Sequence, residues 1–195
     1  MESAVEGSAG LVAQVQSVLL SLRGIWDEVE VDELDHALQA GTAALADGAD
    51  DELVVAAILH DMGHSPLIDR VHDHDRAARE WLTPRLGERV GWLAGAHVAA
   101  KRYLAADAAY VATLSDRSRQ TLSLQGGTAG YAEAGAESDD GAAPVEESWT
   151  THPWWPDALR LRRYDDAAKT AGAQTVSVDE ALAVVYRVAA TRGGA

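Results

Sequence analysis

The chain has 195 residues, of which 47% are hydrophobic, enough for one domain with a sizeable core. It contains no cysteine, which excludes disulfides, iron–sulfur clusters, thiolate metal sites and a cysteine nucleophile. Histidine and carboxylate side chains remain as metal ligands, a set that suits iron, manganese or zinc. The net charge of −15 opposes binding to nucleic acid and to anionic membranes.

The N-terminus lacks the positive charge of a secretory signal, and no apolar run approaches the about 20 residues of a membrane-spanning helix. We therefore expect a cytoplasmic monomer or homodimer that acts on a small molecule, with neither nucleic acid nor a membrane as a partner. Two basic clusters, Lys101-Arg102 and Arg160 to Arg163, stand out in this acidic chain. They either hold a small anion or neutralise neighbouring carboxylates.

Apolar residues at helical spacing predict an all-α fold, and we find no convincing strand pattern. A first amphipathic helix is expected over residues 8–23, before a break at Gly24, and should pack on the core as a brace or lid. Asp32 is the expected N-cap of a second helix, which runs to about Asp47 and carries His36 near its start.

The next helix, capped by Asp50 or Asp51, is apolar on nearly every face over residues 53–59. This pattern predicts a central, fully packed helix. It ends in the adjacent residues His60 and Asp61 and should place both in the interior. A buried imidazole beside a carboxylate is costly unless something pairs with both, and a metal ion does so. The alternative for this dipeptide alone is a His–Asp hydrogen bond that caps the helix.

Two further helices should carry more histidines. One begins after Asp73 and carries His74, and another, over residues 88–103, carries His97 and Lys101 one turn apart. The remaining helices are expected over residues 107–114, 116–124, 157–171 and 179–190.

We expect one domain over residues 1–195, with its core at 30–125 and closing helices at 157–190. Between them, residues 126–152 are rich in glycine, alanine and acidic side chains with little periodicity. This composition predicts a mobile surface loop, which is long for a compact domain.

Side chains that can bind a hard or borderline cation are spread over five predicted helices, which is how a helical bundle builds a metal centre. They are His36, His60, Asp61, His64, His72, His74, His97, Asp165 and Asp166. In order and type, a histidine, a His-Asp pair, later histidines and a final aspartate resemble the HD-domain superfamily of metal-dependent proteins.

Five segments are similar to one branch of that superfamily. They are residues 35–40 (DHALQA), 59–64 (LHDMGH), 97–103 (HVAAKRY), 122–127 (LSLQGG) and 157–166 (DALRLRRYDD). Together they resemble the phosphonate-degrading, mixed-valent diiron oxygenases, relatives of myo-inositol oxygenase that are often labelled predicted HD phosphohydrolases. The resemblance extends over roughly residues 24–172.

The resemblance implies an HD-domain helical bundle with two iron ions (Fe2+ and Fe3+) at its centre and dioxygen as co-substrate. Carried over residue by residue, the six ligands and catalytic residues are His36, His60, Asp61, His74, His97 and Asp165. In such a centre Asp61 would bridge the two ions.

Two choices within this set depend on the spacing seen in the relatives. His74 is preferred to His72 for its distance from Trp81-Leu82. Asp165 is preferred to Asp166 because it stands four residues before Lys169. His72, and likewise His152, are then expected to be exposed loop residues.

The resemblance also implies contacts to the substrate. His64, Lys101 and Arg162 would contact a phosphonate, and Ser118 or Thr121 would add a hydroxyl contact. The implied reaction cleaves the carbon–phosphorus bond of a small 1-hydroxyphosphonate, giving inorganic phosphate and a carboxylic acid. The protein itself would supply ligand geometry, anion binding and the exclusion of water.

Two residues depart from relatives that act on an aminoethyl substrate. Trp26 and Val29 stand where those relatives have an iron-binding tyrosine, displaced by substrate, and a glutamate. Valine does not bind an ammonium group, although Glu28 or Glu30 would if the loop shifted. Trp26 would face a quaternary ammonium group through a cation–π contact or wall off a smaller substrate. The sequence therefore predicts the class of the substrate rather than its identity.

The main alternative is a metal-dependent HD phosphohydrolase that acts on a nucleotide or another phosphate monoester through a metal-bound hydroxide. The segments at residues 97–101, 125–127 and 162–165 favour the oxygenase, whereas the His-Asp core suits both. A non-catalytic metal-binding or regulatory module is a third alternative, against which the complete ligand set argues.

Overall fold

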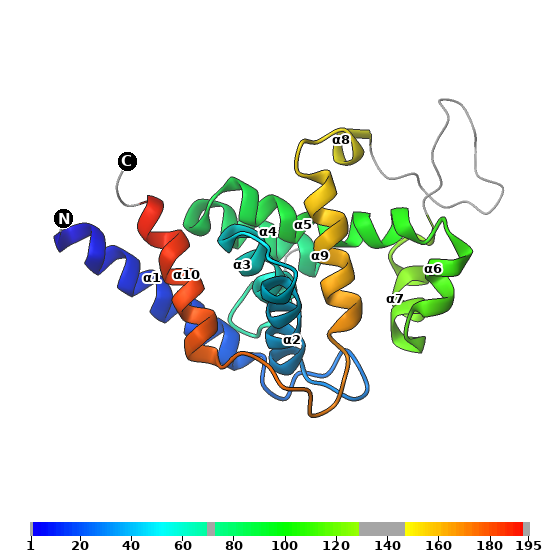
Figure 1. The fold of residues 1–195 in the computed structure, drawn as a ribbon, viewed down its shortest axis with the longest axis horizontal. Helices are drawn as coiled ribbons and strands as arrows, with labels where there is room; N and C mark the ends of the chain where they lie inside the picture. The colour runs from blue at the N-terminus through cyan, green and yellow to red at the C-terminus, as the bar shows by residue number, and fades with distance from the viewer. Residues whose placement is uncertain (1, 70–72, 129–146, 193–195) are drawn as a thin grey trace.

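The computed structural model describes residues 2–69, 73–128 and 147–192 (Figure 1). Within these ranges every regular element is a helix, which confirms the all-α prediction. The helices are α1 (Glu2–Ser21), α2 (Glu33–Ala46), α3 (Asp51–Leu59), the 3-10 turn η1 (Met62–His64), α4 (His74–Leu86), α5 (Glu88–Leu104), α6 (Ala108–Thr113), α7 (Asp116–Leu124), α8 (Glu147–Thr150), α9 (Trp155–Ala167) and α10 (Val178–Arg192). None of these described helices combines the length and apolar character that a membrane span requires.

Helix α3 lies at the centre of the bundle, in contact with α2, α5, α9 and α10. Residues 53–59 are all buried, as their apolar sequence predicts. Its N-cap is Asp50 rather than Asp51, because the Asp50 side chain accepts a hydrogen bond from the backbone N–H of Leu53 at 3.0 Å. Each buried large apolar side chain contributes about 1.5–3 kcal/mol. The core therefore holds the end of this helix, and the His-Asp pair that follows it, in the interior.

Helix α2 begins as expected after Asp32. The Asp32 carboxylate accepts hydrogen bonds from the backbone N–H groups of Asp35 at 3.0 Å and Gly24 at 2.9 Å. Arg23 also pairs with it at 3.0 Å. These contacts tie the start of α2 to the beginning of the loop that follows α1, and His36 faces the core from the first turns of α2.

Helices α1 and α10 pack side by side on one flank of the bundle, so that the two ends of the chain lie near each other (Figure 1). Helix α1 begins at Glu2, earlier than the expected residue 8. Its buried side chains include Val15, Val18 and Leu19, which belong to the main core. This arrangement fits the expected role of the first helix as a brace.

Helix α9 differs at both ends from its expected range. It begins two residues earlier than residue 157, because Pro156 fits the first turn of a helix. It ends at Ala167 rather than near Ala171. The chain turns away there, and the carbonyl of Ala168 accepts a hydrogen bond from Nδ1 of His36 at 2.9 Å.

Most of the loop expected over residues 126–152 falls on residues 129–146, which lie outside the described residues, and its last part contains the short helix α8. Trp149 of α8 packs against Trp92 of α5, with ring centroids 5.2 Å apart. His152 is half-buried and stacks on the same Trp92 ring at 4.1 Å, so it is not the exposed residue that we expected. Aromatic contacts therefore anchor this segment to the bundle.

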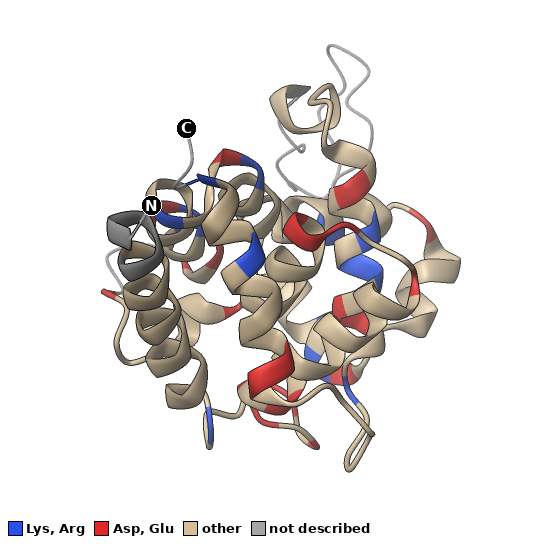
Figure 2. Ribbon diagram, turned by 60° about the vertical axis from the view of Figure 1, so that its left-hand side comes forward, with Lys and Arg blue, Asp and Glu red and all other residues tan. Residues whose placement is uncertain are grey.

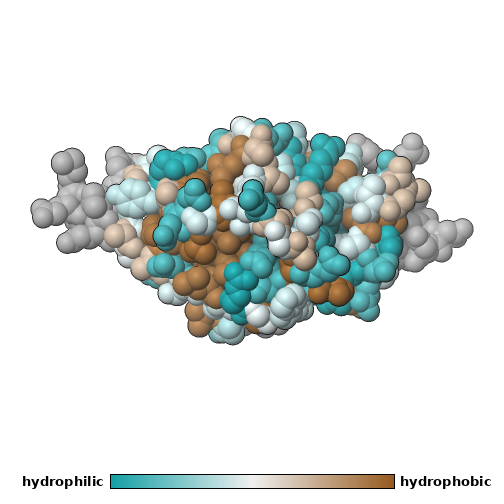
Figure 3. Space-filling view, turned by 60° about the horizontal axis from the view of Figure 1, so that its bottom comes forward, coloured by the Kyte–Doolittle hydropathy of each residue, from teal (hydrophilic) through white to brown (hydrophobic). Residues whose placement is uncertain are grey.

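The surface reflects the composition. Figure 2 shows acidic and basic residues interspersed over the helices and loops. The face in Figure 3 is a mosaic of hydrophilic and hydrophobic residues, with more hydrophobic surface over one half. Among the exposed apolar side chains are Trp26, Val29 and Leu124.

The close approach of α2 and α3 leads to a first prediction. A Cβ atom added to Gly41 would lie 2.5 Å from Cγ1 of Ile58. Gly41→Ala should therefore lower the free energy of unfolding in denaturant by about 1–3 kcal/mol through overpacking. Gly10→Ala in α1 is the control, since nothing lies within 4 Å of the added atom, and it should be neutral or slightly stabilising. Equal effects of the two substitutions would contradict this packing.

Candidate metal centre

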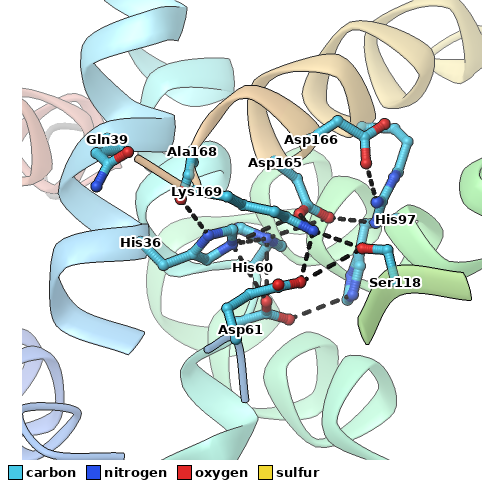
Figure 4. Close-up of polar contacts among 12 residues, drawn as sticks. His36, Gln39, His60, Asp61, His97, Ser118, Asp165, Asp166, Ala168 and Lys169 are labelled. Carbon is cyan, nitrogen blue, oxygen red and sulfur yellow. Dashed lines mark hydrogen bonds and ion pairs between the residues drawn. The ribbon is translucent and has the colours of Figure 1, made fainter. Parts of the chain in front are cut away.

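The structure brings together all six side chains implied as ligands, from α2, α4, α5, α9 and the two residues that follow α3. Figure 4 labels all of them except His74. They form two groups of three residues. Within each group, one nitrogen or oxygen atom of every residue lies within 4.8 Å of those of the other two. One group is His36, His60 and Asp165, and the other is Asp61, His74 and His97. His72, the alternative to His74, lies outside the described residues.

Asp61 lies between the two groups. Its Oδ2 atom is 3.2 Å from Nε2 of His60 and 3.5 Å from Nε2 of His36. Its Oδ1 atom is 3.3 Å from Nε2 of His97 and 3.5 Å from Nε2 of His74. Each carboxylate oxygen thus faces one pair of histidines, which is the placement required of a ligand that bridges two cations.

Backbone carbonyls set the orientation of three of the histidine rings. The Nδ1 hydrogen bonds run from His36 to Ala168 at 2.9 Å, from His60 to Ala57 at 2.8 Å and from His97 to Ala94 at 2.6 Å. A carbonyl oxygen only accepts hydrogen bonds, so each Nδ1 carries the proton. In a neutral ring the Nε2 lone pair then points into the centre, as in metal-binding histidines.

The converging acceptors fit a pair of metal ions. The Nε2 atoms of His36 and His60 are 3.3 Å apart, and those of His74 and His97 are 3.1 Å apart. Neighbouring ligands on an ion with bonds of about 2.1 Å are separated by about 3 Å. Oδ1 of Asp61 is buried and has no hydrogen-bond partner among the described residues. Two cations would satisfy this oxygen and the inward lone pairs together.

The neighbouring carboxylates favour the protonated form of His60. Burial lowers the pKa of His60, but the charges of Asp61 and Asp165 outweigh burial and hold this pKa well above its usual value. Burial lowers the pKa of His97 to about 3, so this ring stays neutral. A metal ion bound at His60 would therefore displace a proton, and its affinity would fall as the pH falls.

A cavity of about 250 Å³ opens beside the two groups and has basic side chains on its lining. Lys101 is buried, and its Nζ donates to Oγ1 of Thr121 at 2.6 Å. Burial, with the charge of Arg162, lowers the pKa of Lys101 to about 8. Lys169 donates to Oγ of Ser118 at 2.6 Å. Both hydroxyls between which the sequence did not decide therefore line the cavity beside a lysine.

Arg162 also lines the cavity, but its guanidinium is held by other side chains. It donates to Asp165 and to Asp166, three and four residues further along α9. Its Nε donates to Oη of Tyr110 at 3.0 Å, and this hydroxyl donates to Asp166 at 2.6 Å. Arg162 therefore orients the Asp165 carboxylate in addition to facing the cavity, so pairing with neighbouring carboxylates, one of the two roles considered for this basic cluster, applies to it.

His64 reaches the cavity from η1, and its ring stacks on that of His74 with centroids 4.6 Å apart. Trp26 does not reach it: 61% of this residue is exposed, and it is absent from the cavity lining. Trp26 therefore does not line the cavity in which we expected it to contact a substrate. The next two residues, Asp27 and Glu28, line the cavity instead.

Ion pairs explain this orientation of the loop. Asp27 pairs with Arg117 of α7 at 2.5 Å, and Glu28 pairs with Lys169 at 2.8 Å. Because both carboxylates turn inward, Trp26 faces solvent. The sequence offered no signal for these contacts, since each joins residues far apart in the chain.

Glu33 is a cavity residue that sequence reasoning missed. It is the first residue of α2, it is 3% exposed, and its Oε2 atom has no hydrogen-bond partner within the described part of the chain. Burial and the charge of Asp61 raise the pKa of Glu33 to about 9. Its position three residues before His36, on the same helix face, is the signal that could have identified it.

The central helix of the bundle ends in a His-Asp pair, and two histidine–carboxylate groups lie beside a cavity lined by both carboxylates and basic side chains. These features define a protein of the HD-domain class. No protein-family model matches the chain. It is 33% identical over 168 residues to the hydroxymethylphosphonate dioxygenase of Gimesia maris, a match that covers 81% of this chain and 77% of that protein. The chain belongs to the family of HD-domain phosphonate oxygenases, which confirms the resemblance seen in the sequence.

Two further relatives match over shorter stretches. The glycine-betaine-forming 1-hydroxy-2-(trimethylamino)ethylphosphonate dioxygenase of Leisingera caerulea is 37% identical over 102 residues, which cover 48% of this chain and 52% of that protein. An uncharacterised protein of Acanthamoeba polyphaga mimivirus is 30% identical over 148 residues, which cover 70% of this chain and 62% of that protein.

The preference for His74 over His72 gives a prediction about metal content. His74→Ala should remove one of two ions bound per chain, because it removes a ligand nitrogen from the group that contains Oδ1 of Asp61. His72→Ala is the matched control and should retain both ions. The measurement is metal analysis after anaerobic loading with Fe2+ and gel filtration. Loss of an ion from the His72 variant, with both retained in the His74 variant, would reverse the assignment.

Proposed function

We propose that this protein is a non-haem, mixed-valent diiron oxygenase that cleaves the carbon–phosphorus bond of a small 1-hydroxyphosphonate. The observation that carries the proposal is the 33% identity to a hydroxymethylphosphonate dioxygenase over 77% of its length. The position of Asp61 between two histidine groups supports it. One hydroxyphosphonate and one dioxygen give one carboxylic acid and one inorganic phosphate, so the atoms of the reaction balance.

Each group of ligands would hold one iron ion. One ion would be held by His36, His60, Asp165 and Oδ2 of Asp61, and the other by His74, His97 and Oδ1 of Asp61. When bound, the two irons supply the redox chemistry with dioxygen that amino-acid side chains lack. The contribution of the chain is to hold these ligands in place before the substrate arrives.

The basic end of the cavity would bind the phosphonate. Lys101 offers a buried ammonium group beside the hydroxyl of Thr121, and Ser118 adds a second hydroxyl. A charge that is shielded from water interacts more strongly with an anion than an exposed one. His64, on the side of His74, would orient the substrate from the opposite direction. Lys169 adds positive charge but already shares it with Glu28.

Arg162 would act mainly through Asp165. Its paired contacts with Asp165 and Asp166 hold the ligand carboxylate in one orientation. Its positive charge also favours an anion in the cavity, whose volume of about 250 Å³ suits a small substrate. Because Trp26 lies outside the cavity lining, recognition of a quaternary ammonium group by this ring is not part of the proposal.

The test combines metal analysis, low-temperature EPR and product analysis. Protein loaded with iron anaerobically and then partly oxidised should hold two irons per chain and give a mixed-valent EPR signal. One member of a panel that includes hydroxymethylphosphonate and 1-hydroxy-2-(trimethylamino)ethylphosphonate should perturb this signal. With that compound, oxygen consumption and phosphate release should occur in a ratio of one to one.

Other results would contradict the oxygenase. A single bound metal would do so, as would a stable pair of zinc or manganese ions without a response to phosphonates. Release of phosphate from nucleotides or other monoesters, without oxygen consumption, would identify a phosphohydrolase instead.

The buried lysine predicts a pH dependence. Because the pKa of Lys101 is lowered to about 8, this side chain is cationic below that pH and becomes neutral above it. The value of kcat/KM for the phosphonate should therefore fall as the pH rises above about 8. Lys101→Arg should lack this fall, since a guanidinium stays charged. Lys101→Ala should lower kcat/KM at pH 7 by about 10- to 100-fold. A fall that persists in Lys101→Arg would assign it to another group.

A further inference from the structure

The carboxyl group of Glu33 has no role in the proposed function, although it lies in the cavity. Its Oε2 atom is buried and without a hydrogen-bond partner in the described chain, as is Oδ1 of Asp61. An oxygen of Glu33, an oxygen of Asp61 and a ring nitrogen of His64 lie within 4.8 Å of one another. Two carboxyl groups and an imidazole therefore meet at one point of the cavity wall.

The basic side chains of the cavity are engaged elsewhere. Lys101 bonds to Thr121, and Lys169 pairs with Glu28. Arg162 bonds to Asp165, Asp166 and Tyr110. Among the described residues no lysine or arginine pairs with Glu33. Two neighbouring carboxyl groups are unfavourable when both are ionised, and a divalent metal ion compensates both charges. An anionic phosphonate at this point would add repulsion, so the chemistry of Glu33 suits a cation.

The two candidate metal positions have unequal sets of ligands. The position at His36 and His60 has four donors, because Asp165 and Oδ2 of Asp61 complete it. The position at His74 and His97 has three, the third being Oδ1 of Asp61. Glu33 shares a group with Asp61 and His64, and His64 in turn stacks on His74 of the position with three donors.

We propose that Glu33 is an oxygen ligand of the metal ion bound by Asp61, His74 and His97. Both positions then have four protein ligands. Glu33 also limits how many places on that ion remain open for other ligands. This inference rests on the two-metal centre of the proposed function but not on the identity of the substrate.

The test uses metal-free protein titrated anaerobically with Co2+, whose visible spectrum reports its coordination. Glu33→Gln keeps the size of the side chain and removes its charge. Glu30→Gln is the matched control, because Glu30 is an exposed residue of the adjoining loop and does not line the cavity. Circular dichroism and thermal unfolding check that both variants are folded. Affinity for hydroxymethylphosphonate is measured on the same loaded proteins.

Wild type and Glu30→Gln should bind two ions with the same spectra. Glu33→Gln should bind one ion unchanged and the other at least about tenfold more weakly, with an altered spectrum for that ion. Two ions bound by Glu33→Gln with unchanged affinity and spectra would overturn the inference alone. The same result with weaker phosphonate binding would assign Glu33 to the substrate and also overturn it. Fewer than two ions on the wild type would instead overturn the two-metal centre itself.

Discussion

The carboxylate of Asp61, whose Oδ1 atom is buried, is the constraint on which the rest of the site depends. An isolated negative charge at this depth is strongly unfavourable, and its two oxygens face four imidazole rings from four helices. Helices α2, α4 and α5 must therefore meet around the end of α3. The apolar packing of α3 opposes any movement of Asp61 toward water, so the core and the polar centre are parts of one arrangement.

The sequence predicted features that are determined locally. The apolar run at residues 53–59 identified the central helix, and Asp32 identified the start of α2, because helical periodicity and capping depend on neighbouring residues. The candidate histidines and aspartates were recognised because they are the metal ligands available to a chain without cysteine. The choice of six among them came from the resemblance to the phosphonate-degrading HD oxygenases. The structure places all six of them together, while their roles as ligands stay a prediction.

The features that the sequence did not predict depend on contacts between distant segments. The inward turn of Glu28, and with it the exposure of Trp26, follows from a pair with Lys169 that lies 141 residues away. Arg162 was assigned to the substrate because nothing in the sequence showed that it bonds to Tyr110. The packing of His152 on Trp92 likewise required the fold of the whole bundle.

The hydrogen bonds that orient His60 and His97 both end on a carbonyl three residues earlier in the same helix. The group that aims each ring is thus part of the backbone, and no neighbouring side chain is needed for the purpose. Residues around the cavity can consequently change during evolution without disturbing the direction of these lone pairs. A scaffold of this kind can acquire a new substrate specificity through substitutions of the residues that line its cavity, while the histidines at its centre keep their orientation.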